Sequence, residues 1–84
     1  MTKLTKSERF LLNEVDSCPD KVARLTGLRH AAVAGRNGLS YRGFSTVLQR
    51  LEDRNLLGRT DEGHLTLTFG GMRAMRANGI EVQW

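Results

Sequence analysis

The sequence is short of cysteine, proline and long apolar runs, and each shortage excludes a class of protein. Cys18 is the only cysteine in 84 residues, so the chain can form neither an internal disulfide nor a zinc site of several thiolates, and we expect a reducing compartment, the cytoplasm. A hydrophobic share of 39% argues against disorder. No segment approaches the roughly 18 consecutive apolar residues that cross a bilayer. The basic N-terminus lacks the apolar core of a signal peptide. We therefore expect a folded cytoplasmic protein without a membrane partner.

Groups that catalyse reactions or hold cofactors are also scarce. Cys18, His30 and His64 are far apart in the sequence, and no histidine pair has metal-binding spacing. Gly70 and Gly71 lie where a helix is expected to begin after a hairpin, which indicates close packing and not a phosphate-binding loop. The chain is therefore predicted to be no enzyme and to use no metal or cofactor.

Positive charge is concentrated in one part of the chain. The formal net charge is +4, and no carboxylate occurs between Asp20 and Glu52. The cationic residues of that stretch are Lys21, Arg24, Arg29, Arg36, Arg42 and Arg50. A solvated face usually mixes both signs, because like charges repel. The distribution therefore favours a polyanion-binding face over an ordinary basic surface.

The first half of the chain predicts two helices around an uncertain segment. Thr5 and Glu8 have the spacing of a capping box, which predicts a helix over residues 5–17 that stops before Pro19. Residues 22–25 are compatible with a short strand or with a helical turn, broken by Gly27. The alanine-rich segment that follows predicts a short helix over 28–36.

The second half gives stronger signals. Ser40 is a good N-cap, and Phe44, Val47, Leu48 and Leu51 recur at helical spacing, which predicts a helix over 41–54. Two runs rich in leucine and threonine then predict a hairpin over 57–68. A last helix is expected over 69–78 with Thr68 as its cap, followed by an alternating apolar tail over 80–84.

The segment from about 39 to 78 resembles the winged helix-turn-helix family, and in particular bacterial regulators of the MarR and PadR groups. Those proteins carry L-x-x-L-E-x-x-G-L-[VI]-x-R, a glycine-containing wing, and then L-T-x-x-G-x-x-A. The matching residues here are Leu48, Leu51, Glu52, Leu56, Leu57, Arg59, Leu67, Thr68, Gly71 and Ala74. The resemblance implies a mainly α fold in one domain over 1–84, with a three-helix core, a two-stranded wing and a C-terminal helix.

The sequence departs from this pattern at three places. Asn55 stands where the family usually has glycine, although asparagine tolerates the left-handed conformation. Phe69 replaces a common proline. Asp61 and Glu62 occupy the wing tip, where basic residues often enter a minor groove. The wing is therefore not expected to contact DNA closely.

Burial of the apolar face of the 41–54 helix leaves polar side chains to read DNA. The predicted DNA-binding residues are Arg36, Asn37, Ser40, Tyr41, Arg42, Ser45, Thr46, Gln49 and Arg50. Arginine can donate two hydrogen bonds to guanine, and glutamine can form two hydrogen bonds with adenine. Hydroxyl groups suit phosphates. The main hypothesis is a transcriptional regulator that binds double-stranded DNA. The alternatives are a protein-interaction module or inhibitor and a nonspecific nucleic-acid binder.

Apolar residues at the C-terminus suggest a further contact. A homodimer is expected to use Met72, Met75, Ile80, Val82 and Trp84. The tail can alternatively fold over the core of its own chain. Dimerisation fits a DNA reader, because two copies can bind two half-sites.

Overall fold

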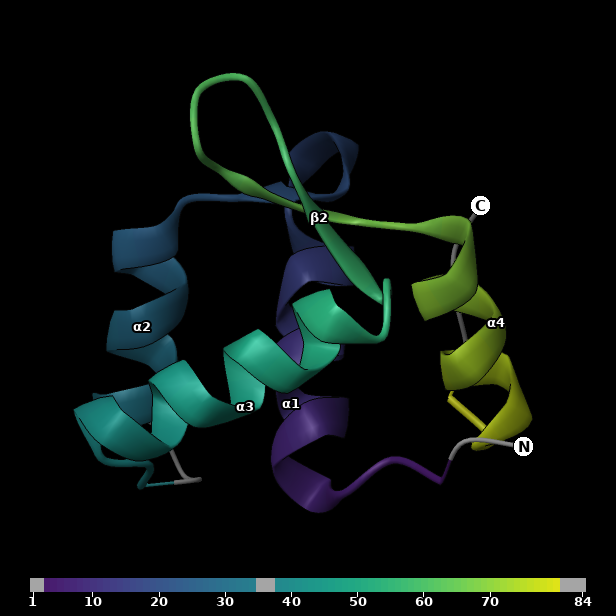
Figure 1. Cartoon of the computed structure of the whole chain (residues 1–84), viewed down its shortest axis with the longest axis horizontal. Helices are drawn as coiled ribbons and strands as arrows, with labels where there is room; N and C mark the ends of the chain where they lie inside the picture. The colour runs from purple at the N-terminus through teal and green to yellow at the C-terminus, as the bar shows by residue number, and fades with distance from the viewer. Residues whose placement is uncertain (1–2, 35–37, 81–84) are drawn as a thin grey trace.

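The structure, a computed structural model, describes residues 3–34 and 38–80. It is mainly helical and contains a small three-stranded antiparallel sheet of order β1-β3-β2 (Figure 1). The elements in chain order are α1 (Lys6–Ser17), the 3-10 helix η1 (Pro19–Lys21), β1 (Val22–Ala23), α2 (Leu25–Ala34), α3 (Tyr41–Asp53), β2 (Leu57–Arg59), β3 (Leu65–Leu67) and α4 (Phe69–Ala77). Within the described ranges, no helix combines the length and apolar character that crossing a membrane requires.

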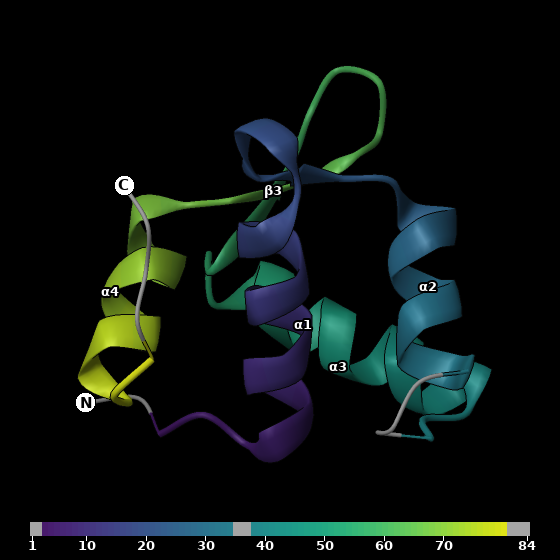
Figure 2. The ribbon, with the colours of Figure 1, turned by 180° about the vertical axis from the view of Figure 1, so that it is seen from behind.

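Helix α1 forms the centre of the molecule, with α2 and α4 on its two sides (Figure 2). The predicted capping box is confirmed: the Glu8 amide donates to Thr5 Oγ1 over 3.2 Å, and the Thr5 amide donates to Glu8 Oε1 over 2.8 Å. Leu11, Leu12 and Val15 are completely buried. The apolar face of α1 is therefore the surface on which the other elements pack.

The segment that the sequence left open contains a strand, and the helix after it begins three residues earlier than expected. The predicted end of that helix at residue 36 lies outside the described residues. Val22 pairs with Thr66 and Ala23 with Leu65, so β1 adds a third strand to the hairpin. The strand alternative for this segment is therefore confirmed, and the predicted two-stranded hairpin is extended by a third strand. Gly27 does not interrupt the helix, because α2 begins at Leu25 and continues past this glycine.

Helix α3 matches its prediction almost residue for residue. Ser40 caps it, because its Oγ accepts the Gly43 amide hydrogen over 3.0 Å. Phe44, Leu48 and Leu51 are buried, while Val47 is half-buried at the margin. The opposite side of the helix is left to solvent.

Asn55 turns the chain after α3 and takes the left-handed conformation, with a φ of 64°. We expect Asn55→Ala to lower the free energy of unfolding by about 1 kcal/mol, because a Cβ without a local hydrogen bond disfavours this conformation. Asn55→Gly should be no less stable than the unsubstituted protein. Urea unfolding measures both variants. Equal stability of the alanine and glycine variants would show that the turn does not depend on this conformation.

The hairpin and α4 complete the fold. Leu57 pairs with Leu67 and Arg59 with Leu65. Thr68 caps α4 as predicted, since its Oγ1 accepts the Gly71 amide hydrogen over 2.9 Å. The expected close packing at Gly71 is confirmed: a Cβ there would lie 2.2 Å from the Leu56 carbonyl oxygen.

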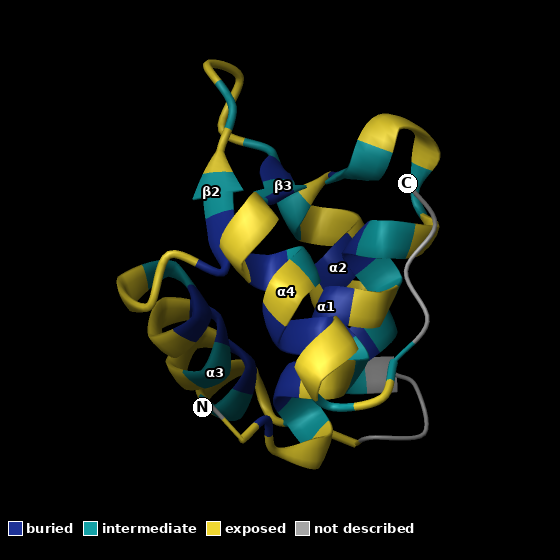
Figure 3. Cartoon of the chain, turned by 90° about the vertical axis from the view of Figure 1, so that its right-hand side faces the viewer, coloured by how far each residue is buried: buried dark blue, intermediate teal, exposed yellow. Residues whose placement is uncertain are grey.

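One charged side chain lies inside the core. The side chain of Glu8 is 1% exposed, and its Oε2 accepts a hydrogen bond from Arg54 Nη2 over 2.6 Å. This ion pair joins the first turn of α1 to the residue that caps the end of α3. Figure 3 shows buried positions of α1 behind the exposed outer face of α4. The Glu8–Arg54 pair links α1 to the end of α3, and the apolar core holds the same two helices together.

Candidate nucleic-acid interface

The fold brings most of the predicted DNA-binding residues together on the outer face of α3. Figure 1 shows α3 lying across the front of the molecule, before α1 and below the hairpin. The predicted residues on α3 or at its cap are all exposed: Ser40, Tyr41, Arg42, Ser45, Thr46, Gln49 and Arg50. One helix therefore presents hydroxyl, amide and guanidinium groups to solvent.

Four of the exposed side chains of α3 share one stripe. Arg42, Thr46, Gln49 and Asp53 follow at intervals of four, three and four, so they lie on one side of the helix. The Thr46 hydroxyl donates to the Arg42 carbonyl oxygen over 2.9 Å. The Gln49 amide nitrogen donates to Asp53 Oδ1 over 2.9 Å. The stripe thus carries a cation near the start of the helix and a carboxylate at its end.

Helix α2 adds a cation beside the start of α3. The guanidinium carbon of Arg29 lies 5.5 Å from the centre of the Tyr41 ring, in a cation–π contact. The Tyr41 residue itself remains 65% exposed. The contact therefore holds a positive charge near the cap of α3 and leaves an aromatic surface open to solvent.

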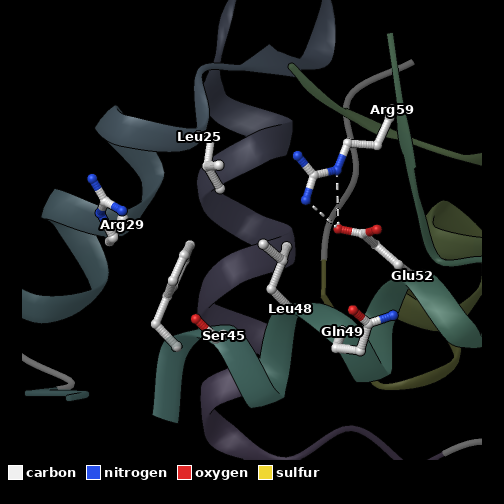
Figure 4. Close-up of a pocket in the computed structure, with 8 residues that line it drawn as sticks. Leu25, Arg29, Ser45, Leu48, Gln49, Glu52 and Arg59 are labelled. Atoms are coloured by element: carbon white, nitrogen blue, oxygen red, sulfur yellow. Dashed lines mark hydrogen bonds and ion pairs between the residues drawn. The ribbon is translucent and has the colours of Figure 1, made fainter. Parts of the chain in front are cut away.

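A groove of about 230 Å³ lies where α2, α3 and β2 meet (Figure 4). Its lining residues are Leu25, Arg29, Phe44, Ser45, Leu48, Gln49, Glu52 and Arg59. The groove is open to solvent, and both apolar and polar side chains line it, among them Ser45 and Gln49 of the outer face of α3.

Arg59 connects the hairpin to α3 across this groove. Its Nη2 lies 2.9 Å from Glu52 Oε1, its Nε donates to the same oxygen over 3.2 Å, and its Nη1 donates to the Gly63 carbonyl oxygen over 3.3 Å. Figure 4 shows the guanidinium directed at the Glu52 carboxylate. The charge of Arg59 is therefore already compensated within the protein.

The turn of the hairpin is acidic, as its sequence indicates. Asp61 and Glu62 are both exposed, and His64 Nε2 lies 3.1 Å from Glu62 Oε2. Together with the compensated charge of Arg59, these carboxylates leave the hairpin poorly suited to a polyanion. The cationic surface belongs to the helices.

The predicted dimer contacts are only partly accessible. Met75 is completely buried in the core of its own chain, so its assignment to a dimer interface was wrong: it packs inward from α4. Met72 and Ile80 are half-buried. Val82 and Trp84, like the predicted DNA-binding residues Arg36 and Asn37, lie outside the described residues.

The described residues do not assemble a metal centre or an activated thiol. No three His, Cys, Asp or Glu side chains among them are placed to hold a metal ion. The Cys18 thiol donates to the Glu14 carbonyl oxygen over 3.2 Å. Burial, and then the charge of Glu14, raises the pKa of the Cys18 thiol above its ordinary value. The thiol therefore stays protonated near neutral pH, which makes it a poor nucleophile.

Three features of this surface were missed by sequence reasoning. The spacing of Gln49 and Asp53 is a known hydrogen-bonding spacing on helices and offered a local signal for their contact. The Arg29–Tyr41 and Arg59–Glu52 contacts join different elements, so only the tertiary fold reveals them.

Comparisons with protein-family models, with curated proteins and with solved structures found none that matches this chain. A function assigned to the chain therefore rests on its own residues and their geometry.

Proposed function

We propose that this protein is a winged helix-turn-helix transcriptional regulator that binds double-stranded DNA and reads the major groove with α3. The observation that carries the proposal is the outer face of α3, where Arg42, Thr46 and Gln49 belong to the exposed stripe that ends at Asp53. The buried side of the same helix is anchored in the core by Phe44 and Leu51. A reading helix needs this combination of a fixed inner face and a free polar outer face.

The side chains of the stripe suit the chemistry of base edges. The major groove is wide enough to admit an α-helix, and each base pair presents a distinct pattern of donors and acceptors there. Arg42 can donate two hydrogen bonds to guanine, and Gln49 can pair with adenine. Ser40, Thr46 and Arg50 lie beside the stripe or within it and suit phosphate oxygens.

The arrangement of charge supports the same orientation. Arg29 and Arg42 are exposed on α2 and α3, whereas Asp61 and Glu62 lie at the far end of the hairpin. A duplex placed against α3 meets the cations, and phosphates near the hairpin turn are repelled. We therefore assign DNA contacts to the helices and none to the hairpin turn.

We also propose that two copies bind together, each on one half-site. Helix-turn-helix dimers place their reading helices about 34 Å apart, one turn of the duplex. The surface proposed for this contact comprises Met72 in the first half of α4 and Ile80 just after its end, joined by Val82 and Trp84 of the tail. Sedimentation with and without residues 80–84 tests it, and a monomer at micromolar concentration in both cases would reject the homodimer.

Two arginines of α3 give a matched test of DNA reading. Arg42→Ala is expected to cost about 1 to 3 kcal/mol on a duplex selected from a random pool, and much less on random DNA, because it removes a base contact. Arg50→Ala removes the same charge from the same helix. We expect it to weaken binding to all sequences equally and to lower the salt slope by about one unit per half-site.

Fluorescence anisotropy with both duplexes at several salt concentrations measures these effects. Gln49→Ala should resemble Arg42→Ala, since both are assigned to bases. Equal small losses on selected and random DNA for all three variants would reject α3 as the reading helix. A steep salt dependence with no sequence preference would instead identify a nonspecific nucleic-acid binder.

The second candidate function is a protein-interaction module. The compensated Arg59 and the exposed Asp61 and Glu62 give the hairpin an acidic surface that suits a basic protein partner. Failure to select any duplex, together with salt-sensitive binding to a basic protein that Asp61→Asn weakens, would favour this function.

A further inference from the structure

The contact between Gln49 and Asp53 fixes the direction of an amide on the outer face of α3. Gln49 Nε2 lies 2.9 Å from Asp53 Oδ1, and both residues are exposed. An ionised carboxylate can only accept hydrogen bonds, so it must face the nitrogen of the amide and not the oxygen. Asp53 therefore holds Gln49 in one of the two orientations that a glutamine amide can take.

The groups left free on Gln49 match one base. An amide nitrogen carries two N–H groups, so one remains after the other has donated to Asp53. With Oε1 this leaves one donor and one acceptor. Adenine presents the complementary pair in the major groove, with N7 as an acceptor and the N6 amino group as a donor.

We propose that Asp53 is a positioning residue that makes Gln49 selective for adenine, an inference that rests on the proposed reading of DNA by α3. A carboxylate close to phosphates weakens binding to every sequence, because like charges repel. Asp53 therefore contributes sequence preference at the cost of affinity. It acts through Gln49 and contacts no base itself.

A double-mutant cycle on Gln49 and Asp53 tests this role. The measured quantity is the ratio of affinities for the selected duplex and for the same duplex with the adenine read by Gln49 replaced. D53A should reduce this ratio about fivefold, the low end of what a bidentate contact supplies, while affinity for both duplexes rises from the loss of charge. In a Q49A background D53A should leave the ratio unchanged and still raise both affinities.

D53N is the matched control, because it removes the same charge and keeps an acceptor oxygen. It should raise affinity as D53A does and retain more of the preference. Circular dichroism checks that the variants fold, which is expected since both side chains are exposed.

Three results would overturn the inference while leaving DNA reading intact. They are an unchanged ratio in D53A, an equal loss in D53A and D53N, and a loss in D53A that persists in the Q49A background. If the unsubstituted protein itself prefers no duplex, the proposed function fails and this inference fails with it.

Discussion

Gly71→Ala is expected to lower the free energy of unfolding by about 3 kcal/mol, the upper end of the usual cost of overpacking. Helix α4 begins against the chain that leaves α3, so a Cβ on Gly71 would lie 2.2 Å from the Leu56 carbonyl oxygen and 2.7 Å from Leu67 Cδ1. A side chain can rotate away from such a contact, but a backbone carbonyl cannot. Either α4 or the start of the hairpin must therefore move, and urea unfolding followed by circular dichroism measures the cost.

Gly27→Ala is the matched control for this substitution. Gly27 also lies inside a helix, but a Cβ there would meet nothing within 4 Å. Alanine should therefore stabilise α2 by about 1 kcal/mol through its better helix propensity. If Gly71→Ala lowers the free energy of unfolding while Gly27→Ala raises it, the loss at Gly71 comes from the close contact. A loss below about 1 kcal/mol at Gly71 would show that α4 is free to shift.

Arg54→Ala should also cost about 3 kcal/mol, because it leaves the buried carboxylate of Glu8 without its partner. Arg54 Nη2 lies 2.6 Å from Glu8 Oε2, and the two side chains are 35% and 1% exposed. Water reaches the arginine but not the carboxylate. For this reason the cost falls at the low end of the range for broken buried pairs.

Glu8→Gln in the Arg54→Ala background separates the charge from the other contacts of Glu8. Glutamine removes the unpaired charge and keeps an oxygen for the Thr5 amide, which donates to Glu8 over 2.8 Å. The double variant should therefore be more stable than Arg54→Ala alone, as urea unfolding can measure. If Glu8→Gln brings no recovery, the loss in Arg54→Ala came from packing of the arginine stem and not from the charge.

The parts of the fold that the sequence predicted are those fixed by near neighbours. Thr5, Ser40 and Thr68 cap helices through residues three positions away, so their signals are local. Strand β1 was not predictable in the same way. Its two residues acquire their strand geometry by pairing with Thr66 and Leu65, on the far side of two helices in the chain.

In the candidate site, too, features fixed by near neighbours in the chain were predictable, and contacts between distant elements were not. Helical periodicity predicted which side chains of α3 are exposed, because burial of Phe44, Leu48 and Leu51 fixes which face of the helix is left to solvent. Periodicity could not reveal that Arg59 is held by Glu52, since the two residues meet only when the hairpin folds against α3. The apolar composition of the C-terminal region misplaced Met75 in a dimer interface, because its inward direction follows from the packing of α4 on α1.

The central position of β3 in the sheet has a consequence for the order of folding. Pairing of Ala23 with Leu65 closes a loop that contains both α2 and α3. Contacts between residues distant in the chain form late, because the entropy of closing the loop must first be overcome. During synthesis, α1, α2 and α3 all emerge before β3, so the contacts of β3 with α1 and β1 form only after Leu65–Leu67 follows. A nascent chain that stops short of β3 thus carries every side chain of the α3 stripe but lacks the central strand that joins β1 to β2.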